Sequence, residues 1–201
     1  MMKLYFNPAS PFARKARISA LELGLAERIE LVALTLTPVQ PHHGLRAHNP
    51  LGKIPALVTD ADEALYDSPV ICEYLDALAG GGRLWPAAGP ARWRALRRQA
   101  LADGLADAAI LMRYELVVRP EALRWSEWLE GQRLKVRTAL DALEAEPLDG
   151  PFDIGAISIV CALEYFEFRF PEERWREGRP QLAAWHEGLS HRPSVVATRP
   201  A

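Results

Sequence analysis

The sequence predicts an α/β domain followed by an all-helical domain, and three observations support this prediction. Up to about residue 78, β-prone runs alternate with amphipathic helical segments, in an order that suits a small mixed sheet with helices packed on it. The next twelve residues, AGGGRLWPAAGP, contain four glycines and two prolines, which is typical of a linker. Beyond it the apolar residues recur at helical spacing. We therefore divide the chain into residues 1–78, a linker at 79–89, and residues 90–201.

The composition is that of a folded protein with reduced cysteines. The chain has 201 residues, of which 49% are hydrophobic and 25% charged, which excludes a disordered chain. Its net charge of -2 gives no electrostatic reason to expect nucleic acid or anionic lipid as a partner. No run is apolar enough for a membrane span. Cys72 and Cys161 lie in apolar helical runs and are expected to be buried thiols, so we predict a cytoplasmic protein without a metal centre.

The first half is predicted to hold four strands and the helices between them. Gly24 is placed to end the first helix, because glycine adopts the left-handed conformation that follows many helices. The adjacent His42 and His43 are expected to begin a second helix, since no third residue accompanies them as a metal ligand. The predicted strands cover residues 3–6, 28–36, 55–58 and 64–66, and the clearest helices cover residues 11–25 and 68–78.

The second half is predicted to be helical throughout. Pro120 separates a helix over 90–118 from a second long helix over 121–145. Residues 152–168 are apolar nearly all round, which indicates a buried central helix, with Asp153 as its N-cap and Phe152 packing against Ile157. A short helix within 180–193 precedes a polar tail. The buried face of the helix at 90–118 is expected to consist of Trp93, Leu96, Ala100, Gly104, Ala108 and Leu111.

A Ser-Pro pair opens a helix at residues 10–11 and again at residues 68–69. One interpretation is purely structural, because serine at the N-cap and proline at the first helical position are the preferred start of a helix. The other is functional. Each pair directly follows a β-prone segment, so two helix N-termini are expected side by side at one edge of the sheet. Free N–H groups at helix N-termini favour anions, which would suit a ligand with more than one anionic group.

The segment NPLGKIPALV, residues 49–58, lies between these two pairs. A proline at the start of a β-prone run cannot join a central ladder, so Pro55 is expected at an edge or in a tight bend. A cis Ile54–Pro55 bond would leave the Ile54 backbone free to pair with an extended peptide. The alternative is an ordinary trans proline that opens a strand, and the residues alone leave both open.

Three stretches, in this order and spacing, resemble the glutathione S-transferase family: SPFARKARI, NPLGKIPALV and LYDSPVICEYL. The buried stretch FDIGAISIVCALEYFEFRFPE is similar to the sixth helix of that family, and the resemblance covers essentially the whole chain. It implies a thioredoxin-like N-terminal domain of the order βαβαββα, an all-α C-terminal domain, and a homodimer. It also implies glutathione as co-substrate.

The resemblance assigns site residues by position. Ser10 would face the glutathione sulfur, and Ile54 and Pro55 would form the bend that pairs with its cysteinyl part. Asp67 and Ser68 would hold the γ-glutamyl end, with Lys53 near the glycine carboxylate. No cysteine stands at position 10, which argues against members that form mixed disulfides. Further possible site residues are Phe12, Arg14, Asp103 and Arg113.

Two of these further residues have an equally simple alternative. Arg14 either adds positive charge near the sulfur or is a solvated helix arginine. Asp103 and Asp107, four residues apart, are most simply a solvated helix face that pairs with arginine, although in some family members an acid of this helix reaches the ligand's ammonium across the dimer. This chain has Asp153 where the family more often has Ser or Thr, and Ala156 where the family more often has Asp. These departures predict some loss of stability.

The function implied is that of a cytoplasmic, homodimeric glutathione transferase. It would activate the glutathione thiol at Ser10 for conjugation to small hydrophobic electrophiles in detoxification. Two alternatives stay open, a non-catalytic binding or regulatory protein with this fold, and a glutathione-dependent reductase of peroxides or disulfides. The sequence does not identify the electrophile.

Overall fold

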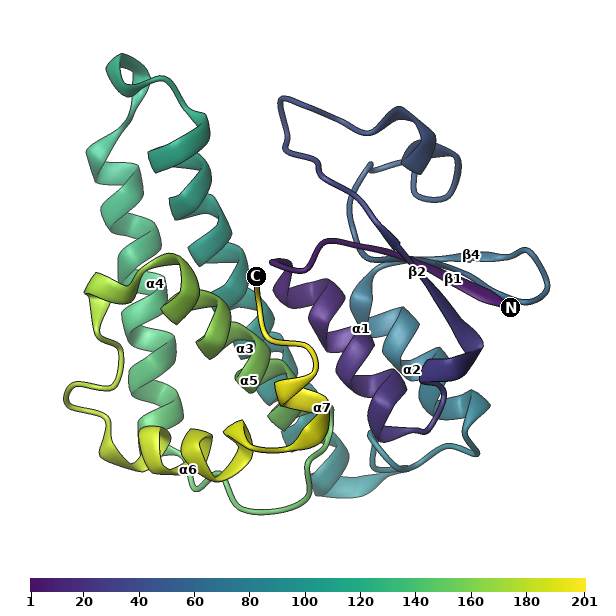
Figure 1. Ribbon diagram of the computed structural model, residues 1–201. Coiled ribbons are helices and arrows are strands. Elements are labelled where there is room, and N and C mark those ends of the chain that lie inside the picture. The colour runs from purple at the N-terminus through teal and green to yellow at the C-terminus, as the bar shows by residue number, and fades with distance from the viewer.

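The computed structural model describes all 201 residues and consists of a four-stranded sheet with helices and a larger helical part (Figure 1). The strand order is β2-β1-β3-β4, with β1 parallel to β2 and antiparallel to β3, and β3 antiparallel to β4. The predicted strands are confirmed: β1 begins one residue earlier than predicted, and the other three are shorter than the β-prone runs that predicted them. Their bounds are β1 (Met2–Phe6), β2 (Ile29–Ala33), β3 (Ala56–Val58) and β4 (Ala64–Leu65).

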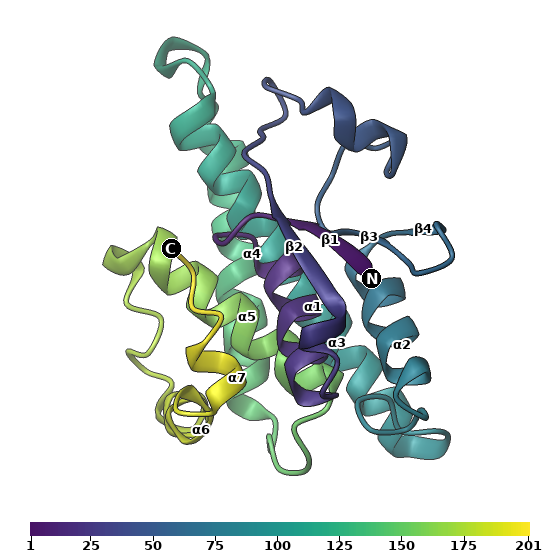
Figure 2. The same ribbon diagram turned by 45° about the vertical axis from the view of Figure 1, so that its right-hand side comes forward.

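Helices α1 (Pro11–Glu22) and α2 (Ser68–Leu78) cover one face of the sheet, and the segment that contains the short 3-10 helix η2 (His43–Ala47) lies on the other side (Figure 2). Gly24 follows α1 with a φ of +72°, the left-handed conformation predicted for it. The Nδ1 atom of His42 accepts the backbone N–H of Leu45 at 3.2 Å, so this histidine caps η2. A further 3-10 turn, η1 (Ala26–Arg28), leads into β2.

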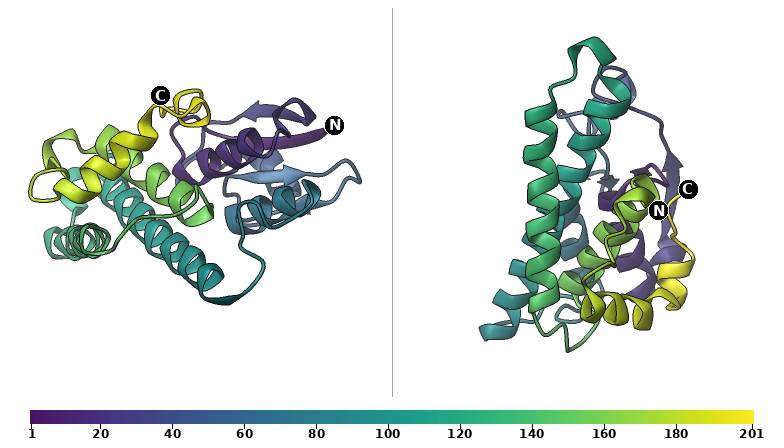
Figure 3. Two further views of the ribbon diagram at one scale, coloured as in Figure 1. Left: turned by 90° about the horizontal axis from the view of Figure 1, so that it is seen from below. Right: turned by 90° about the vertical axis from the view of Figure 1, so that its left-hand side faces the viewer.

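The helical part packs around a central helix, α5 (Ile154–Arg169), twelve of whose sixteen residues are buried. Asp153 caps α5 as predicted, since its carboxylate accepts the backbone N–H of Ala156 at 3.0 Å. Figure 3 shows the long antiparallel pair α3 and α4 beside α5. The other elements are α3 (Gly89–Arg113), the π-helical turn η3 (Tyr114–Val118), η4 (Glu121–Leu123), α4 (Ser126–Ala145), η5 (Pro171–Glu173), α6 (Pro180–Ser190) and α7 (Pro193–Val196).

Most of the predicted buried face of α3 is wrong, although Ala108 is buried as predicted. Trp93 is 68% exposed, and Ala100, Gly104 and Leu111 are exposed as well. The reason is a very close approach of α5, because a Cβ added to Gly155 would lie only 2.8 Å from the Cβ of Arg98. Such an approach selects small side chains over bulky ones at the contact. The buried face therefore holds Ala95, Ala102, Leu105, Ala106, Ala109 and Met112, while Trp93 points outward.

The helix predicted over 121–145 begins only at Ser126. The preceding residues form a hairpin that is closed by the buried carboxylate of Glu115. This carboxylate accepts the backbone N–H of Trp125 and the Nε–H of Arg119, both at 2.7 Å. The backbone before Ser126 is thus bonded back to α3, which stops α4 from extending toward residue 121.

The glycine-rich segment between α2 and α3 is packed rather than open. The carboxylate of Asp76 in α2 accepts the backbone N–H groups of Gly82, Arg83 and Leu84 at 2.9–3.1 Å. Leu84 and Trp85 are both 3% exposed and belong to the hydrophobic core that the sheet shares with α1, α2 and α5. The segment therefore joins the two parts of the molecule through buried contacts.

Cys72 and Cys161 are free and buried, as predicted. Burial raises the pKa of Cys72 to about 11 and that of Cys161 to about 12, so neither thiol is reactive at neutral pH. None of the helices combines the length and the apolar character that crossing a membrane requires.

Candidate functional site

The turn between β1 and α1 presents Ser10 at the start of a helix. Asn7 shapes this turn: its carbonyl accepts the Ser10 N–H at 3.0 Å, and its side chain bonds the Ala9 N–H and the Leu34 carbonyl. The Ser10 Oγ accepts the N–H of Ala13 at 3.3 Å and so caps α1. Because the oxygen is the acceptor in this bond, the O–H of Ser10 stays available to donate to a ligand.

The second Ser-Pro pair is arranged differently from the first. Asp67, not Ser68, is the N-cap of α2, and its side chain makes no capping bond. Ser68 is the first helical residue and is 1% exposed, with Pro69 as the second. The leading N–H groups of a helix have no partner within it. The exposed carboxylate of Asp67 and the N-terminal end of α2 are thus adjacent, one negative and one positive.

The segment before β3 lies between these two helix ends. Asn49 is 1% exposed and holds the segment in place, because its Nδ2 donates to the Lys53 carbonyl at 2.8 Å and its Oδ1 accepts the Leu51 N–H at 3.0 Å. The Ile54–Pro55 peptide bond is cis, as is the Tyr66–Asp67 bond. Ile54 lies outside the strands, and its backbone makes no hydrogen bond within the chain.

The strand register brings all three segments to one edge of the sheet. Tyr5, near the end of β1, pairs with Ala56 at the start of β3, and Leu57 pairs with Leu65 at the end of β4. The chain therefore leaves β1 toward Ser10, enters β3 from Pro55, and leaves β4 toward Asp67 at the same edge. Figure 1 shows the beginning of α1 at this edge, facing α3.

Asp103 of α3 is bound by Lys15, a residue that the sequence analysis did not single out. The Nζ of Lys15 lies 2.7 Å from each carboxylate oxygen, and the lysine side chain is 1% exposed. Burial raises the pKa of Asp103, the nearby Asp67 raises it further, and Lys15 opposes both. The expectation that Asp103 is a solvated acid paired with an arginine is therefore wrong.

Charges from two other segments act on Asp107 of α3. Burial and the Asp103 carboxylate raise the pKa of Asp107, Lys53 lowers it, and Asp67 raises it again. Lys53 and Asp67 therefore lie near enough to α3 for their charges to influence this carboxyl.

Arg14 is neither solvated nor free. Its NH2 lies 2.7 Å from the Glu164 carboxylate and 3.0 Å from the Val195 carbonyl, and its Nε donates to Thr198 Oγ1 at 3.2 Å. With its side chain 2% exposed, Arg14 fastens α1 to α5 and to the C-terminal residues. The C-terminal segment, predicted as a polar tail, is correspondingly buried at Val195 and Thr198.

Phe12 and Arg113 lie on the helical side of the site. Phe12 is half-buried and packs against the core cluster that contains Met112 and Tyr165. Arg113 ends α3 and is half-buried. It also lies close enough to Tyr165 to lower the pKa of that phenol, which burial nevertheless raises to about 12.

Residues that position the site were missed by the sequence reasoning. Asn7 and Asn49 shape the two loops, and Lys15 links α1 to α3. The sequence did contain a signal that Lys15 is buried. Lys15 lies four residues after Pro11 and four before Ser19, on the side of the helix that also carries apolar residues. An asparagine in a turn carries no comparable signal, because asparagine is common in turns of every kind.

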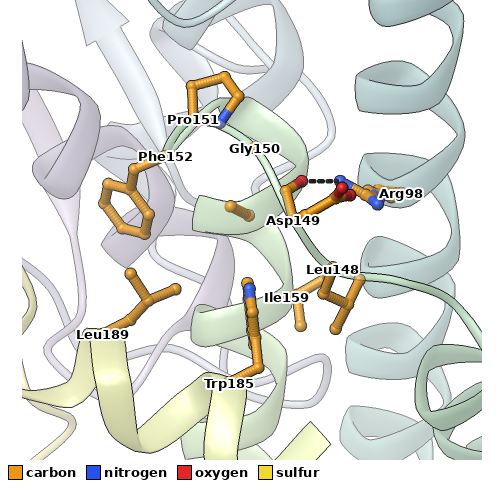
Figure 4. Close-up of a pocket in the computed structure, with 10 residues that line it drawn as sticks. Arg98, Leu148, Asp149, Gly150, Pro151, Phe152, Ile159, Trp185 and Leu189 are labelled. Atoms are coloured by element: carbon orange, nitrogen blue, oxygen red, sulfur yellow. Dashed lines mark hydrogen bonds between the residues drawn. The ribbon is translucent and has the colours of Figure 1, made fainter. Parts of the chain in front are cut away.

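A small cavity of about 30 Å³ lies elsewhere, where α3, α5, α6 and the loop before α5 meet (Figure 4). Arg98 spans it and donates to the carbonyls of Pro147 and Asp149 at 2.6 and 3.4 Å. A cavity of this size holds at most a water molecule or two. None of the predicted site residues lines it, and we regard it as structural.

The comparisons with known proteins agree with this geometry. Residues 9–78 match the family model described as glutathione S-transferase, N-terminal domain, and residues 126–188 match that of the C-terminal domain. The uncharacterized GST-like protein YibF of Escherichia coli (strain K12) is 34% identical over 204 residues, which is 99% of this chain and 98% of that protein.

Solved structures extend the likeness to the whole fold. A glutathione transferase family member from Pseudomonas fluorescens Pf-5, with bound glutathione, is 50% identical and covers 100% of both chains with a TM-score of 0.98. A second structure of a Pf-5 family member, with bound S-(propanoic acid)-glutathione, has the same identity and coverage and a TM-score of 0.93. Two matching domain models and this close likeness show that the chain belongs to the glutathione S-transferase family.

Proposed function

We propose that this protein is a glutathione transferase that activates the glutathione thiol through Ser10 and conjugates it to small electrophiles. The observation that carries the proposal is the convergence of three segments at one sheet edge: the capped start of α1, the segment before Pro55, and the start of α2. The glutathione-bound relative, 50% identical, supports glutathione as the ligand.

The chemistry proposed for Ser10 is hydrogen-bond donation rather than proton removal. A thiol with a pKa of about 8.5 is mostly protonated at neutral pH, and the thiolate is the nucleophile. The Ser10 O–H and the N-terminal end of α1 would both stabilise a sulfur anion. Lowering the thiol pKa by two units needs about 2.7 kcal/mol, which one charge-assisted hydrogen bond and a helix end can supply.

The conjugation itself is a nucleophilic substitution or addition in which the sulfur attacks a carbon of the electrophile. The thiol proton passes to solvent and the thiolate forms a carbon–sulfur bond with the electrophile. A leaving group then departs with its electron pair, or, at an activated double bond, the adjacent carbon takes up a proton from water. A relative with bound S-(propanoic acid)-glutathione, a thioether of glutathione, supports the binding of such a product.

The second helix end suits the γ-glutamyl group of glutathione. In our proposal the leading N–H groups of α2 and Ser68 bind its carboxylate, and Asp67 binds its ammonium, with Asp103 close by. The Ile54 backbone pairs with the cysteinyl part, and Lys53 lies near the glycine carboxylate. We also propose a homodimer, in keeping with the outward-facing Trp93 on α3.

The test of Ser10 separates its chemical role from its capping role. Glycine at an N-cap costs only a few tenths of a kcal/mol relative to serine, whereas alanine costs about 1 kcal/mol. We expect Ser10→Gly and Ser10→Ala to lower kcat/KM for a chlorinated nitroaromatic by about ten- to a hundredfold. Ser10→Thr keeps the hydroxyl and is expected to retain most of the activity. Ultraviolet absorbance of bound thiolate, followed against pH, measures the thiol pKa directly.

An unchanged rate and an unchanged thiol pKa in Ser10→Gly would remove Ser10 from the mechanism. Retention on immobilised glutathione without turnover of a broad electrophile panel would instead favour a binding or regulatory protein. Activity on peroxides or disulfides in place of conjugation would identify a reductase. Each result needs only the intact protein, so the three functions are distinguished in one set of assays.

A further inference from the structure

Two arginines without acidic partners lie together at the ends of α3 and α5. Arg113 is the last residue of α3 and Arg169 the last residue of α5, and both are half-buried. The Arg169 guanidinium lies 4.3 Å from the ring centroid of Phe168 and 5.9 Å from that of Tyr165. Its Nε is buried and has no hydrogen-bond partner in the chain.

Two carboxylates of the neighbouring segments are already bound elsewhere. Glu167 pairs with Arg176, and Glu173 pairs with Arg133, so neither neutralises the two arginines. Burial lowers the pKa of Arg169, the charge of Arg113 lowers it further, and the Tyr165 phenol opposes both. A pair of partly desolvated cations with free donors is costly in isolation and favourable around an anion.

The pair is placed on the helical side of the proposed active site. Phe12, two residues after Ser10, packs against the core cluster that contains Met112 and Tyr165, the neighbours of these arginines. Arg14 binds Glu164, which immediately precedes Tyr165. In Figures 1 and 2 the last turn of α5 reaches the level of the beginning of α1. The Arg14–Glu164 contact thus holds α5 against the helix that Ser10 opens, and Arg169 lies on the last turn of α5 beyond this contact.

We propose that Arg113 and Arg169 form a subsite for a carboxylate carried by the electrophile. This inference rests on the function proposed above and narrows its substrate class from small hydrophobic electrophiles to those that also bear an anionic group. The aromatic rings of Tyr114 and Tyr165 supply the apolar wall, and the two guanidinium groups supply the charge.

A matched pair of electrophiles tests the subsite. 4-Chloro-3-nitrobenzoate and 4-chloro-3-nitrobenzamide have the same leaving group and nearly the same shape, but only the first is charged. Rates are divided by the uncatalysed rate of each compound with glutathione. We expect Arg113→Gln/Arg169→Gln to lower kcat/KM for the benzoate by about tenfold or more, and for the benzamide by less than about twofold.

Arg137→Gln is the control for the loss of a surface cation, because Arg137 is an exposed arginine of α4. It is expected to leave the ratio of the two rates unchanged. Equal losses for benzoate and benzamide in the double variant would overturn the subsite and indicate general damage. Arg169→Lys, which keeps the charge, checks folding and is expected to retain part of the preference.

Binding measurements separate this inference from the proposed function. Calorimetry compares the affinities of the protein for two glutathione conjugates, one carrying the carboxylate and the other the amide. This measurement needs no turnover. We expect the wild type to bind the carboxylate conjugate about tenfold more tightly and the double variant to bind both alike. Equal binding by the wild type would refute the subsite while leaving conjugation intact. If the wild type binds the carboxylate conjugate more tightly but turns over neither electrophile, conjugation is refuted and the subsite is supported.

Discussion

Single residues in this protein serve both the packing of the fold and the proposed site, and the Lys15–Asp103 pair is the clearest case. Lys15 is almost fully buried, and Asp103 is the one carboxylate with which it forms an ion pair. Asp103 in turn lies beside Asp67 at the proposed γ-glutamyl position. Because burial favours the neutral form of the carboxyl, Lys15 opposes the rise in the Asp103 pKa and so favours the charged form, which is the form that would bind a ligand's ammonium.

We expect Asp103→Asn to destabilise the fold by about 3 kcal/mol, since it leaves a buried ammonium without a counter-charge. Lys15→Met alone should raise the pKa of Asp103 further, because only burial and Asp67 would then act on it. Urea unfolding measures the first effect and a carboxyl NMR titration the second. The double variant Lys15→Met/Asp103→Leu should recover much of the stability; additive losses in the double variant would contradict a direct coupling.

At the scale of elements, the segment between α2 and α3 shows how a glycine-rich stretch becomes ordered. Three successive backbone N–H groups donate to one carboxylate, that of Asp76, and the side chains of Leu84 and Trp85 enter the core. The backbone N–H of Ile154, the first residue of α5, also donates to the Leu84 carbonyl at 3.1 Å. This short segment thus fixes the start of the central helix relative to α2.

Asp76→Ala is expected to lower the free energy of unfolding by about 3 kcal/mol, because it leaves buried N–H groups without an acceptor. Asp76→Asn should cost less, since one oxygen still accepts. Asp141→Asn, which removes an exposed carboxylate paired with Arg179, is the control and should cost less than about 1 kcal/mol. If Asp76→Ala behaves like this control in urea titrations, the carboxylate does not hold the segment.

At the scale of the whole molecule, a buried network joins the sheet part to the helical part. Glu164 of α5 accepts from Arg14 of α1 at 2.7 Å and from His186 of α6 at 3.1 Å. Burial favours the neutral form of Glu164, but the hydrogen bonds from His186 and Arg14 and the charge of Arg14 outweigh it. The pKa of Glu164 is therefore lowered from its ordinary value of 4.5.

The lowered pKa makes this network sensitive to acid. Because the unfolded chain binds the Glu164 proton more tightly than the folded chain, the stabilisation is complete above about pH 4.5 and is lost as the pH falls through the lowered pKa. We expect Glu164→Gln to cost about 3 kcal/mol at pH 7, with the difference from wild type shrinking below pH 4.5. Chemical unfolding across this range measures it.

Glu187→Gln, an exposed change on α6, controls for the loss of a carboxylate and should cost little at any pH. A difference between wild type and Glu164→Gln that stays constant from pH 7 to pH 3 would show that the charge of Glu164 is not what joins the two parts.

The sequence by itself determined the features that depend on neighbouring residues. The cap of α1 at Ser10, the cap of α5 at Asp153 and the glycine after α1 all follow from contacts within a few residues. The order of strands and helices also followed, because hydrophobic periodicity reports which elements form.

Only the tertiary structure decided which side chains meet across elements. Lys15 and Asp103 are 88 residues apart in the chain, and the partners of Arg14 in the C-terminal segment are more than 180 residues away from it. The buried face of α3 was likewise set by how closely α5 approaches it. The sizes of the side chains along α3 alone do not reveal that approach. Local sequence fixes the backbone of an element, whereas the pairing of buried charges depends on how all the elements pack together.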